Sequence, residues 1–380
     1  MKKLKWIICL IAMILMAAAN DMPVLAADQI NVSADAAILM DAKTGQVLYS
    51  KNPFKKRAPA STTKVITALL AIETGTLTDK VTISRKAART EGSSMYLKTG
   101  EVFTLSDLLY GALLNSGNDA CVAIAEQVVG SVKNFAVLMN MKALALGALN
   151  THFVNPNGLP NQDHYTCAYD LALFARQALA NSTFSNIVST KDRVIDLPAP
   201  KGERRLKNTN KLLWRYLWAD GVKTGTTSAA GPCLISSASK GNRQLLAVVL
   251  RSGDRWKDSI KMFEYGFNNF EYKQVSVTGE KFTSIMVTYG KQKEVPALYS
   301  KDLGVLIPAG GKRGLEQRVS LQPELTAPVS KGQVLGSVSY YTNNRYVGKV
   351  NLLAGQDVYK LGFFDRFFHW LRAKIKNIFG

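Results

Sequence analysis

The chain has 380 residues, of which 47% are hydrophobic and 20% charged, and it contains no periodic repeat and no low-complexity tract. This composition excludes a low-complexity chain and is that of an ordinary globular protein, long enough for two domains. The formal charge of +20 at pH 7 favours anionic surroundings, namely nucleic acid, anionic lipid or an acidic polymer, and does not choose among them.

The N-terminus has the features of a secretory signal peptide. Three lysines in the first five residues precede an apolar run over residues 6–19, and Val24-Leu25-Ala26 offers small residues at the spacing of a cleavage site. We therefore predict a signal peptide over residues 1–26 and an exported protein, with a permanent N-terminal anchor as the alternative. Export argues against nucleic acid as a partner and leaves anionic lipids and wall polymers.

The region 27–271 mixes strand-like and helix-like patterns. A hairpin is predicted over residues 36–50 around the turn Lys43-Thr44-Gly45, and a helix is predicted from Ser61 to Gly75. Further helices are expected at 106–114, 120–129, 132–146, 169–180 and 258–270, and two strands at 233–238 and 244–250. Helices bracketed by early and late strands predict an α/β domain whose sheet combines strands from both ends of the segment.

The pattern changes after residue 272. Short alternating runs separated by Gly, Pro, Asn and Lys predict a small all-β domain over residues 272–360. In residues 361–380, one helical face collects the apolar side chains Phe364, Phe367, Phe368, Leu371, Ile375, Ile378 and Phe379. This amphipathic helix is too short and too charged to span a bilayer, and it suits the surface of an anionic membrane. Packing against the β domain is the alternative.

Ser61-Thr62-Thr63-Lys64 places a hydroxyl and an amine three residues apart at the start of the predicted helix. Residues at i and i+3 share a helix face, so Lys64 can act as a base towards Ser61 if its pKa is depressed. The pattern alone is weak, because Ser237-Ala-Ser-Lys240 matches it in a predicted strand that runs into a turn.

Two more short patterns follow in the chain. Ser116-Gly117-Asn118 lies between two predicted helices, where it serves either as a cap or as a proton path to Lys64. Lys-Thr-Gly occurs three times, and only the copy at Lys223 follows both serine motifs and leads to the late strand pair. There a lysine offers a cation to a carboxylate, and Gly225 lets a substrate backbone come close.

The order Ser-x-x-Lys, Ser-x-Asn, Lys-Thr-Gly is that of penicillin-binding proteins and class A β-lactamases. With Gly117 in the middle motif, the chain resembles the D-alanyl-D-alanine carboxypeptidase branch of the low-molecular-mass penicillin-binding proteins. The segments 114–120, 151–156 and 220–227 also resemble that family, as does the layout of signal, catalytic domain, β domain and terminal helix. The resemblance implies a catalytic domain of penicillin-binding-protein and β-lactamase type, with an antiparallel sheet flanked by helices.

The resemblance also implies roles for individual residues. Ser61 would form the acyl-enzyme, Lys64 would be the general base, and Ser116 and Asn118 would complete the proton path. The N–H groups of Ser61 and Thr226 would form the oxyanion hole.

The remaining roles concern the substrate's end. Lys223 and Thr224 would hold the terminal carboxylate of D-alanine, helped by an arginine, for which Arg255 is the first candidate and Arg251 the second. The implied substrate is a peptidoglycan stem peptide ending in D-Ala-D-Ala, and β-lactam antibiotics would bind covalently. No metal and no cofactor is expected.

Several other functions are weighed against this one. A Ser-His-Asp hydrolase has little support, because the chain has three histidines and no Gly-x-Ser-x-Gly, and a zinc enzyme would need ligand clusters that are not evident. A class A β-lactamase needs a deacylating glutamate, and between Ser116 and Lys223 the only candidates are Glu126 and Glu203. A D,D-endopeptidase and a non-catalytic wall-binding protein remain as alternatives.

Three cysteines remain in the mature chain, and an odd number cannot all pair. Cys121, Cys167 and Cys233 lie among apolar or small residues, so we expect buried free thiols.

Overall fold

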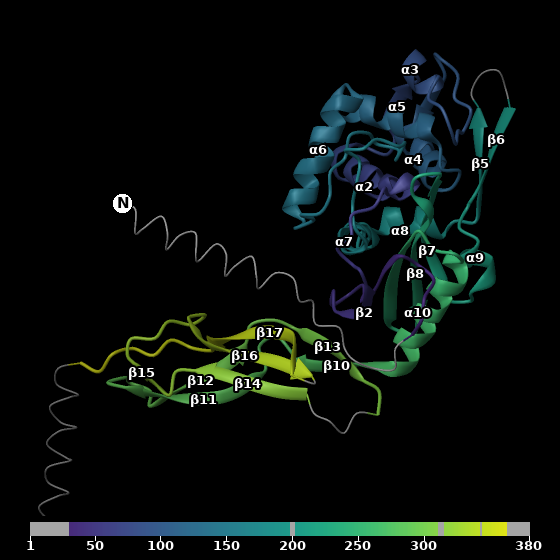
Figure 1. Cartoon of the computed structure of the whole chain (residues 1–380). Helices are drawn as coiled ribbons and strands as arrows, with labels where there is room; N and C mark the ends of the chain where they lie inside the picture. Colours follow the sequence, from purple (N-terminus) through teal and green to yellow (C-terminus); the bar gives the residue numbers. More distant parts are fainter. Residues whose placement is uncertain (1–29, 198–201, 311–314, 343, 363–380) are drawn as a thin grey trace, which may run out of the picture. The chain divides into compact units, whose positions relative to one another are not determined.

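The computed structural model describes residues 30–197, 202–310, 315–342 and 344–362 (Figure 1). The chain divides into two compact units, and the boundary between them in the sequence lies between Asn269 and Phe270. The predicted signal peptide and almost all of the predicted terminal helix lie outside the described residues.

The first unit is built on a five-stranded antiparallel sheet in the order β2-β1-β9-β8-β7. These strands are β1 (Ala36–Asp41), β2 (Val47–Lys51), β7 (Ala219–Thr227), β8 (Gly231–Lys240) and β9 (Arg243–Leu250). The N-terminal hairpin joins the late hairpin through β1 and β9, which run antiparallel with Ala36 opposite Leu250. The sheet therefore combines both ends of the unit, as the sequence predicts.

Both faces of this sheet are covered, which explains why its central strands are continuous apolar runs. All six residues of β1 are buried, and so are the last six of β9. The helix α10 (Arg255–Asn269) packs against β9, β8 and β1, and α7 (Ala168–Leu179) packs against the same strands (Figure 1). On α10, a Cβ at Gly266 would lie 2.6 Å from a Leu245 methyl, so this glycine lets the helix approach the sheet closely.

The other helices include those that carry the serine motifs. They are η1 (Ala60–Thr63), α2 (Lys64–Thr74), α3 (Arg85–Ala88), α4 (Leu105–Leu113), α5 (Asn118–Val129), α6 (Val132–Ala145), α8 (Ser182–Ser189) and α9 (Leu212–Arg215). The predicted helices are confirmed within one or two residues at most ends. The start of α4 is fixed by a capping box, in which Thr104 and Asp107 exchange side-chain-to-backbone hydrogen bonds.

Several short elements are absent from the sequence-based prediction. They are α3, α8, α9, β3 (Lys80–Thr82), β4 (Val102–Thr104), β5 (Asp192–Leu197), β6 (Gly202–Lys207) and, most importantly, β7. The segment of β7 mixes Asp, Gly, Lys and Thr without apolar alternation, so its sequence carries no strand signal. It becomes a strand because it pairs along its length with β8, from Ala219 opposite Ala238 to Thr227 opposite Gly231.

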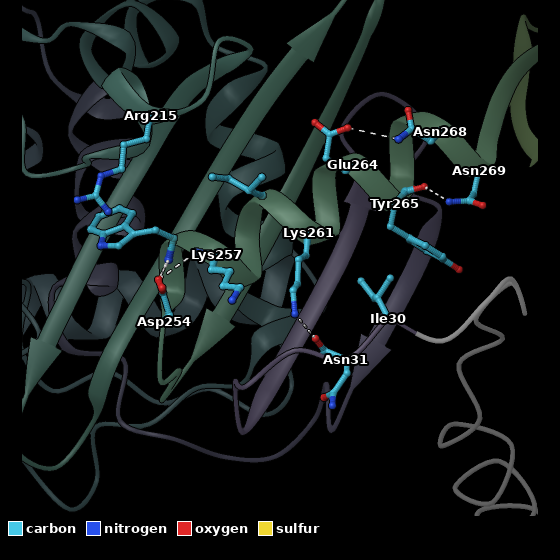
Figure 2. A pocket seen from close by; sticks show the side chains of 12 residues that line it. Ile30, Asn31, Arg215, Asp254, Lys257, Lys261, Glu264, Tyr265, Asn268 and Asn269 are labelled. Carbon is cyan, nitrogen blue, oxygen red and sulfur yellow. Dashed lines mark hydrogen bonds between the residues drawn. The ribbon is translucent and has the colours of Figure 1, made fainter.

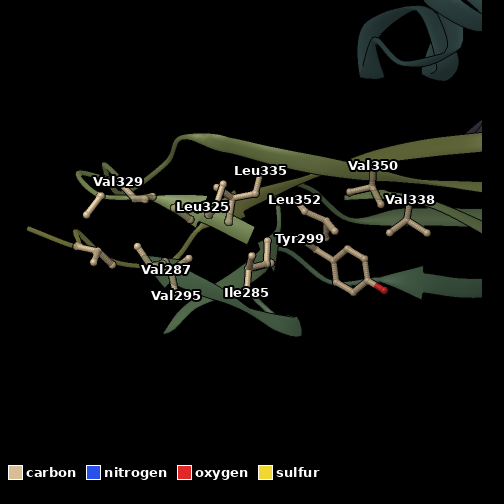
Figure 3. Close-up of a cluster of buried hydrophobic side chains, with 14 of the residues drawn as sticks. Ile285, Val287, Val295, Tyr299, Leu325, Val329, Leu335, Val338, Val350 and Leu352 are labelled. Atoms are coloured by element: carbon tan, nitrogen blue, oxygen red, sulfur yellow. The ribbon is translucent and has the colours of Figure 1, made fainter. Parts of the chain in front are cut away.

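The second unit is all-β, as predicted. Its strands are β10 (Phe270–Ser276), β11 (Lys281–Thr288), β12 (Glu294–Tyr299), β13 (Leu303–Pro308), β14 (Leu315–Leu321), β15 (Glu324–Thr326), β16 (Val334–Thr342) and β17 (Arg345–Ala354). Six of them form one sheet in the order β14-β16-β17-β12-β11-β15, and β10 pairs with β13. Alternate residues of these strands, including Val295, Val338 and Leu352, form a buried apolar cluster (Figure 3).

Among the described residues, no single helix has both the length and the apolar character needed to cross a bilayer. The pair α5 and α6 reaches those limits only jointly, across an 83° bend.

Candidate active site

Ser61 and Lys64 lie at the junction of η1 and α2, with the hydroxyl at the mouth of the site and the amine inside. Ser61 is half-buried and Lys64 is fully buried, and 2.8 Å separates Ser61 Oγ from Lys64 Nζ. The contact follows from the i and i+3 spacing in one helical turn. The second match to this pattern, Ser237 to Lys240, lies in β8 and makes no such pair among the described contacts.

The other two partners of the Lys64 amine are carbonyl oxygens. Nζ lies 2.7 Å from Asn118 Oδ1 and 2.9 Å from the carbonyl oxygen of Asn157, and both atoms only accept hydrogen bonds. When the amine is neutral, its two N–H groups suffice for these carbonyls, and its lone pair is then available to accept the Ser61 proton. Burial lowers the pKa of Lys64 to about 8, against smaller opposing effects of Cys121 and Asp119.

The Ser116-Gly117-Asn118 segment connects α4 to α5 and is held by backbone contacts. The Asn118 amide nitrogen Nδ2 donates to the carbonyl of Glu91 at 2.7 Å, and its backbone N–H donates to Ser93. Ser116 is buried in a left-handed conformation with φ of 62°, and its hydroxyl has no hydrogen bond among the described residues. The proton-path role of Ser116 stays a prediction.

The buried carboxylate of Asp119 fixes the loop that borders this segment. It accepts hydrogen bonds from Ser94 Oγ at 2.6 Å and from the backbone N–H groups of Met95 and Leu97, both at 3.1 Å. The loop from Glu91 to Leu97 is thereby tied to the start of α5, next to Asn118.

Lys223, Thr224, Gly225 and Thr226 lie on β7, which is the edge strand of the sheet on the side of Ser61. A Cβ on Gly225 would lie 3.0 Å from the backbone nitrogen of Ser61, so glycine allows β7 to press against η1. Lys223 is buried, and its Nζ donates to the Thr224 carbonyl at 3.0 Å. Burial, followed by the nearby cation of Lys64, lowers the pKa of Lys223 well below its usual range.

Arg255 reaches the same strand from the first turn of α10. Its Nη1 donates to the Gly225 carbonyl at 3.0 Å, to Thr226 Oγ1 at 2.9 Å and to the Cys233 carbonyl at 3.1 Å. Arg251 is exposed, and its side chain lies beside Gly231. The structure therefore brings Arg255, and not Arg251, to β7.

The site contains residues to which the sequence gave no role. Asn157 and Gly158 form a loop whose backbone contacts both Lys64 and the Ala60–Ser61 peptide, and Thr63 bonds to His164 behind the nucleophile. The segment 151–156 resembles the family, which pointed to this neighbourhood without assigning a function to any of its residues.

The histidines and cysteines do not form a second catalytic centre among the described residues. His164 bonds to Thr63 and to the Val154 backbone N–H, while His152 Nδ1 bonds to the Asp163 carbonyl, so neither is paired with a carboxylate. Groups of His, Cys, Asp and Glu able to hold a metal ion are absent from the described ranges. The predicted buried free thiols are confirmed: Cys121, Cys167 and Cys233 are all buried and unpaired with one another.

A groove of about 750 Å³ runs along α10 (Figure 2). Its described lining includes Arg215, Lys257, Lys261 and Glu264, and none of the predicted site residues. The chemistry that the motifs predict therefore lies elsewhere, where η1, α5 and β7 meet.

Comparison with known proteins matches each of the two units to a described family. Residues 23–253 match the peptidase S11 family, described as D-alanyl-D-alanine carboxypeptidase, and residues 270–360 match the C-terminal domain of penicillin-binding protein 5. D-alanyl-D-alanine carboxypeptidase DacF of Bacillus subtilis is 35% identical over 339 residues, which cover 87% of each chain. DacC of Escherichia coli is 35% identical over 366 residues, covering 92% of this chain and 90% of the relative.

A solved structure agrees. Penicillin-binding protein 5 from Haemophilus influenzae has a TM-score of 0.79 at 32% identity, covering 88% of this chain and all of that one. The family, the order of the three motifs and the contact between Ser61 and Lys64 lead to one assignment. The chain belongs to the D-alanyl-D-alanine carboxypeptidase family.

Proposed function

We propose that this protein is a serine D-alanyl-D-alanine carboxypeptidase that removes the terminal D-alanine from peptidoglycan stem pentapeptides through an acyl-enzyme on Ser61. The observation that carries the proposal is the buried amine of Lys64, which lies 2.8 Å from Ser61 Oγ and whose other two partners are carbonyl oxygens. A serine becomes an effective nucleophile when such a base removes its proton.

The reaction follows from this geometry. Lys64 takes the proton of Ser61, and Oγ attacks the carbonyl carbon between the two D-alanines. The negative charge that develops on the carbonyl oxygen is stabilised by the backbone N–H groups of Ser61 and Thr226, which Gly225 brings together. The leaving amine takes a proton through Ser116, and water then hydrolyses the acyl-enzyme.

The cationic residues on and beside β7 would recognise the free C-terminal carboxylate of the substrate peptide. Lys223 and Thr224 are neighbours on this strand, and Arg255 Nη1 is held beside the next two residues by the Gly225 carbonyl and Thr226 Oγ1. Burial also lowers the pKa of Lys223, and a substrate carboxylate would favour its charged form. A site built in this way selects a peptide that ends in a carboxylate.

Hydrolysis of a β-lactam adduct should be slow. Of the two glutamates considered for a deacylating role, Glu126 accepts a hydrogen bond from Ser84 Oγ at 2.6 Å, and Glu203 is exposed on β6 beside Arg205. With both carboxylates engaged elsewhere, penicillin is expected to remain on Ser61. This favours a penicillin-binding protein over a class A β-lactamase.

The direct test is incubation of the purified protein with a muropeptide pentapeptide, followed by mass analysis. Loss of one alanine is expected for the wild type and not for Ser61→Ala, and peptide mapping should place a long-lived penicillin adduct on Ser61. The Ser237→Ala variant is the matched control and should behave as the wild type. An adduct on Ser237, or cleavage by Ser61→Ala, would contradict the assignment.

We further propose that the protein is exported and held at the outer face of the cytoplasmic membrane by the C-terminal helix. The support is the sequence of 363–380, whose apolar face and basic residues suit the surface of anionic lipid. Each basic residue near such a surface contributes about 1 kcal/mol.

A chain ending at Gly362 tests the anchor. It keeps the Leu361 N–H bonded to the Tyr289 carbonyl at 2.8 Å, so the β domain should stay folded. We expect this shortened protein to cleave the pentapeptide at the wild-type rate and to lose sedimentation with anionic vesicles, while neither form binds neutral vesicles. Unchanged sedimentation would place the anchor elsewhere, and a lowered melting temperature would make the helix part of the fold.

A further inference from the structure

A chain of buried hydrogen bonds runs behind the nucleophile and ends on the peptide group that precedes Ser61. The Val154 N–H donates to His164 Nδ1 at 3.1 Å, His164 Nε2 lies 2.9 Å from Thr63 Oγ1, and Thr63 Oγ1 donates to the Ala60 carbonyl at 2.9 Å. Thr63 is fully buried and His164 is 2% exposed, so water does not compete for these groups.

The donor and acceptor roles in this series of hydrogen bonds are fixed by the groups at its two ends, the Val154 N–H and the Ala60 carbonyl. Because His164 Nδ1 accepts from a backbone N–H, the ring proton is on Nε2 and is donated to Thr63. Thr63 then has its own hydrogen available for the Ala60 carbonyl. Burial lowers the pKa of His164 to about 4, which keeps the ring neutral and this order intact at working pH.

The last hydrogen bond of this series, to the Ala60 carbonyl, determines the direction of the Ser61 N–H, which is one of the two proposed oxyanion donors. The Ala60 carbonyl and the Ser61 N–H belong to one planar peptide group, so holding the oxygen fixes the direction of the N–H. Ala60 has a φ of 50°, a left-handed conformation that non-glycine residues adopt only when their surroundings hold them there. The Thr63 hydroxyl supplies one such restraint directly on this peptide group.

His164 is also connected to the support of the base. Val154, whose N–H it accepts, starts the segment that contains Pro156 and Asn157. The Asn157 carbonyl holds Lys64 Nζ at 2.9 Å, and the Pro156 carbonyl accepts from Thr67 of α2 at 2.6 Å. One imidazole therefore ties the segment that holds the general base to the turn that carries the nucleophile.

We infer that His164, acting through Thr63, is a positioning residue that aims the Ser61 N–H at the developing oxyanion. The inference rests on the proposed function. It predicts that removing one of these hydrogen bonds weakens transition-state binding and leaves substrate binding unchanged, because neither the His164 nor the Thr63 side chain is expected to touch the substrate.

The first variants to compare are Thr63→Val and Thr63→Ser. Valine keeps the shape and removes the hydroxyl, so kcat should fall on the order of 10- to 100-fold with KM unchanged. Serine keeps the hydroxyl and should restore most of the rate. The matched control is Thr74→Val, which removes a hydroxyl bonded to the Leu70 carbonyl at 2.7 Å in the adjoining helix α2, and it should leave kcat unchanged.

A second readout separates positioning from loss of structure. A peptide boronic acid ending in a D-alanine analogue forms a tetrahedral adduct on Ser61, with an oxygen in the oxyanion hole. Its Kd should rise for Thr63→Val by the same factor as kcat falls. For His164→Gln, whose amide can still donate to Thr63, the loss should be smaller than for His164→Leu.

The outcomes distinguish this inference from the proposed function. A wild type that releases no alanine contradicts the proposed function and with it this inference. An active wild type whose Thr63→Val variant matches it in kcat and in boronic acid Kd overturns the positioning role alone. The positioning role is also overturned if Thr63→Val has a low kcat but binds the boronic acid as tightly as the wild type. Should His164→Leu fail to fold, the Thr63 variants alone provide the test.

Discussion

Lys64→Arg is expected to abolish acylation of Ser61 by both the pentapeptide and penicillin. Arginine stays protonated at every working pH, so it has no lone pair to accept the Ser61 proton. General-base catalysis contributes about 10²- to 10⁴-fold, and a loss of this size would show in the initial rate of adduct formation followed by mass spectrometry. The variant also places a permanent charge at the position where the wild-type amine, held by Asn118 Oδ1 and the Asn157 carbonyl, can lose its proton.

The pH profile of the wild type should also show that acylation requires a deprotonated Lys64. Because the pKa of Lys64 is about 8, most molecules carry the protonated amine below that pH, and kcat/KM should rise as the pH increases through about 8. The matched control is Lys240→Arg, the second Ser-x-x-Lys lysine, which is exposed at the end of β8 and should keep the wild-type rate and profile. A Lys64→Arg variant that acylates as fast as the wild type would remove Lys64 from the role of base.

Gly158→Ala is expected to have the second-largest effect, although it adds only a methyl group. A Cβ at this position would lie 1.8 Å from the Ala60 carbonyl oxygen and 2.3 Å from its carbon, so the backbone beside Ser61 must move. A displacement of about 1 Å in a catalytic group lowers the rate by about 100-fold. We expect kcat/KM to fall at least that far, with a loss of about 1–3 kcal/mol in the free energy of unfolding.

The matched control is Gly130→Ala, because Gly130 has a similar left-handed φ of 76° with nothing within 4 Å of an added Cβ. That variant bears only the conformational cost of about 1–2 kcal/mol and should retain full activity. Denaturant unfolding and pentapeptide kinetics on both variants separate backbone strain from the steric clash. Equal activity in the two variants would show that Gly158 does not fix the nucleophile.

The amino-acid sequence by itself determined the elements with strong local periodicity. The helix after Ser61 was predictable because its apolar residues repeat at the helical period. The hairpin over 36–50 and the apolar strands at 233–250 were predictable as short apolar runs separated by turn residues. The order of the three motifs identified the chemistry, because Ser61 and Lys64 meet within a single helical turn and need no distant partner to do so.

The tertiary structure decided what depends on contacts between distant segments. Lys223 lies on a strand because β8 pairs with it, and Arg255 reaches that strand because α10 starts beside it. The spacing of Ser61 and Lys64 predicts their contact, whereas the protonation state of Lys64 depends on its burial and on carbonyl groups 54 and 93 residues away. A local pattern can place two side chains together, but the desolvation that makes one of them a base is produced only by the packed fold.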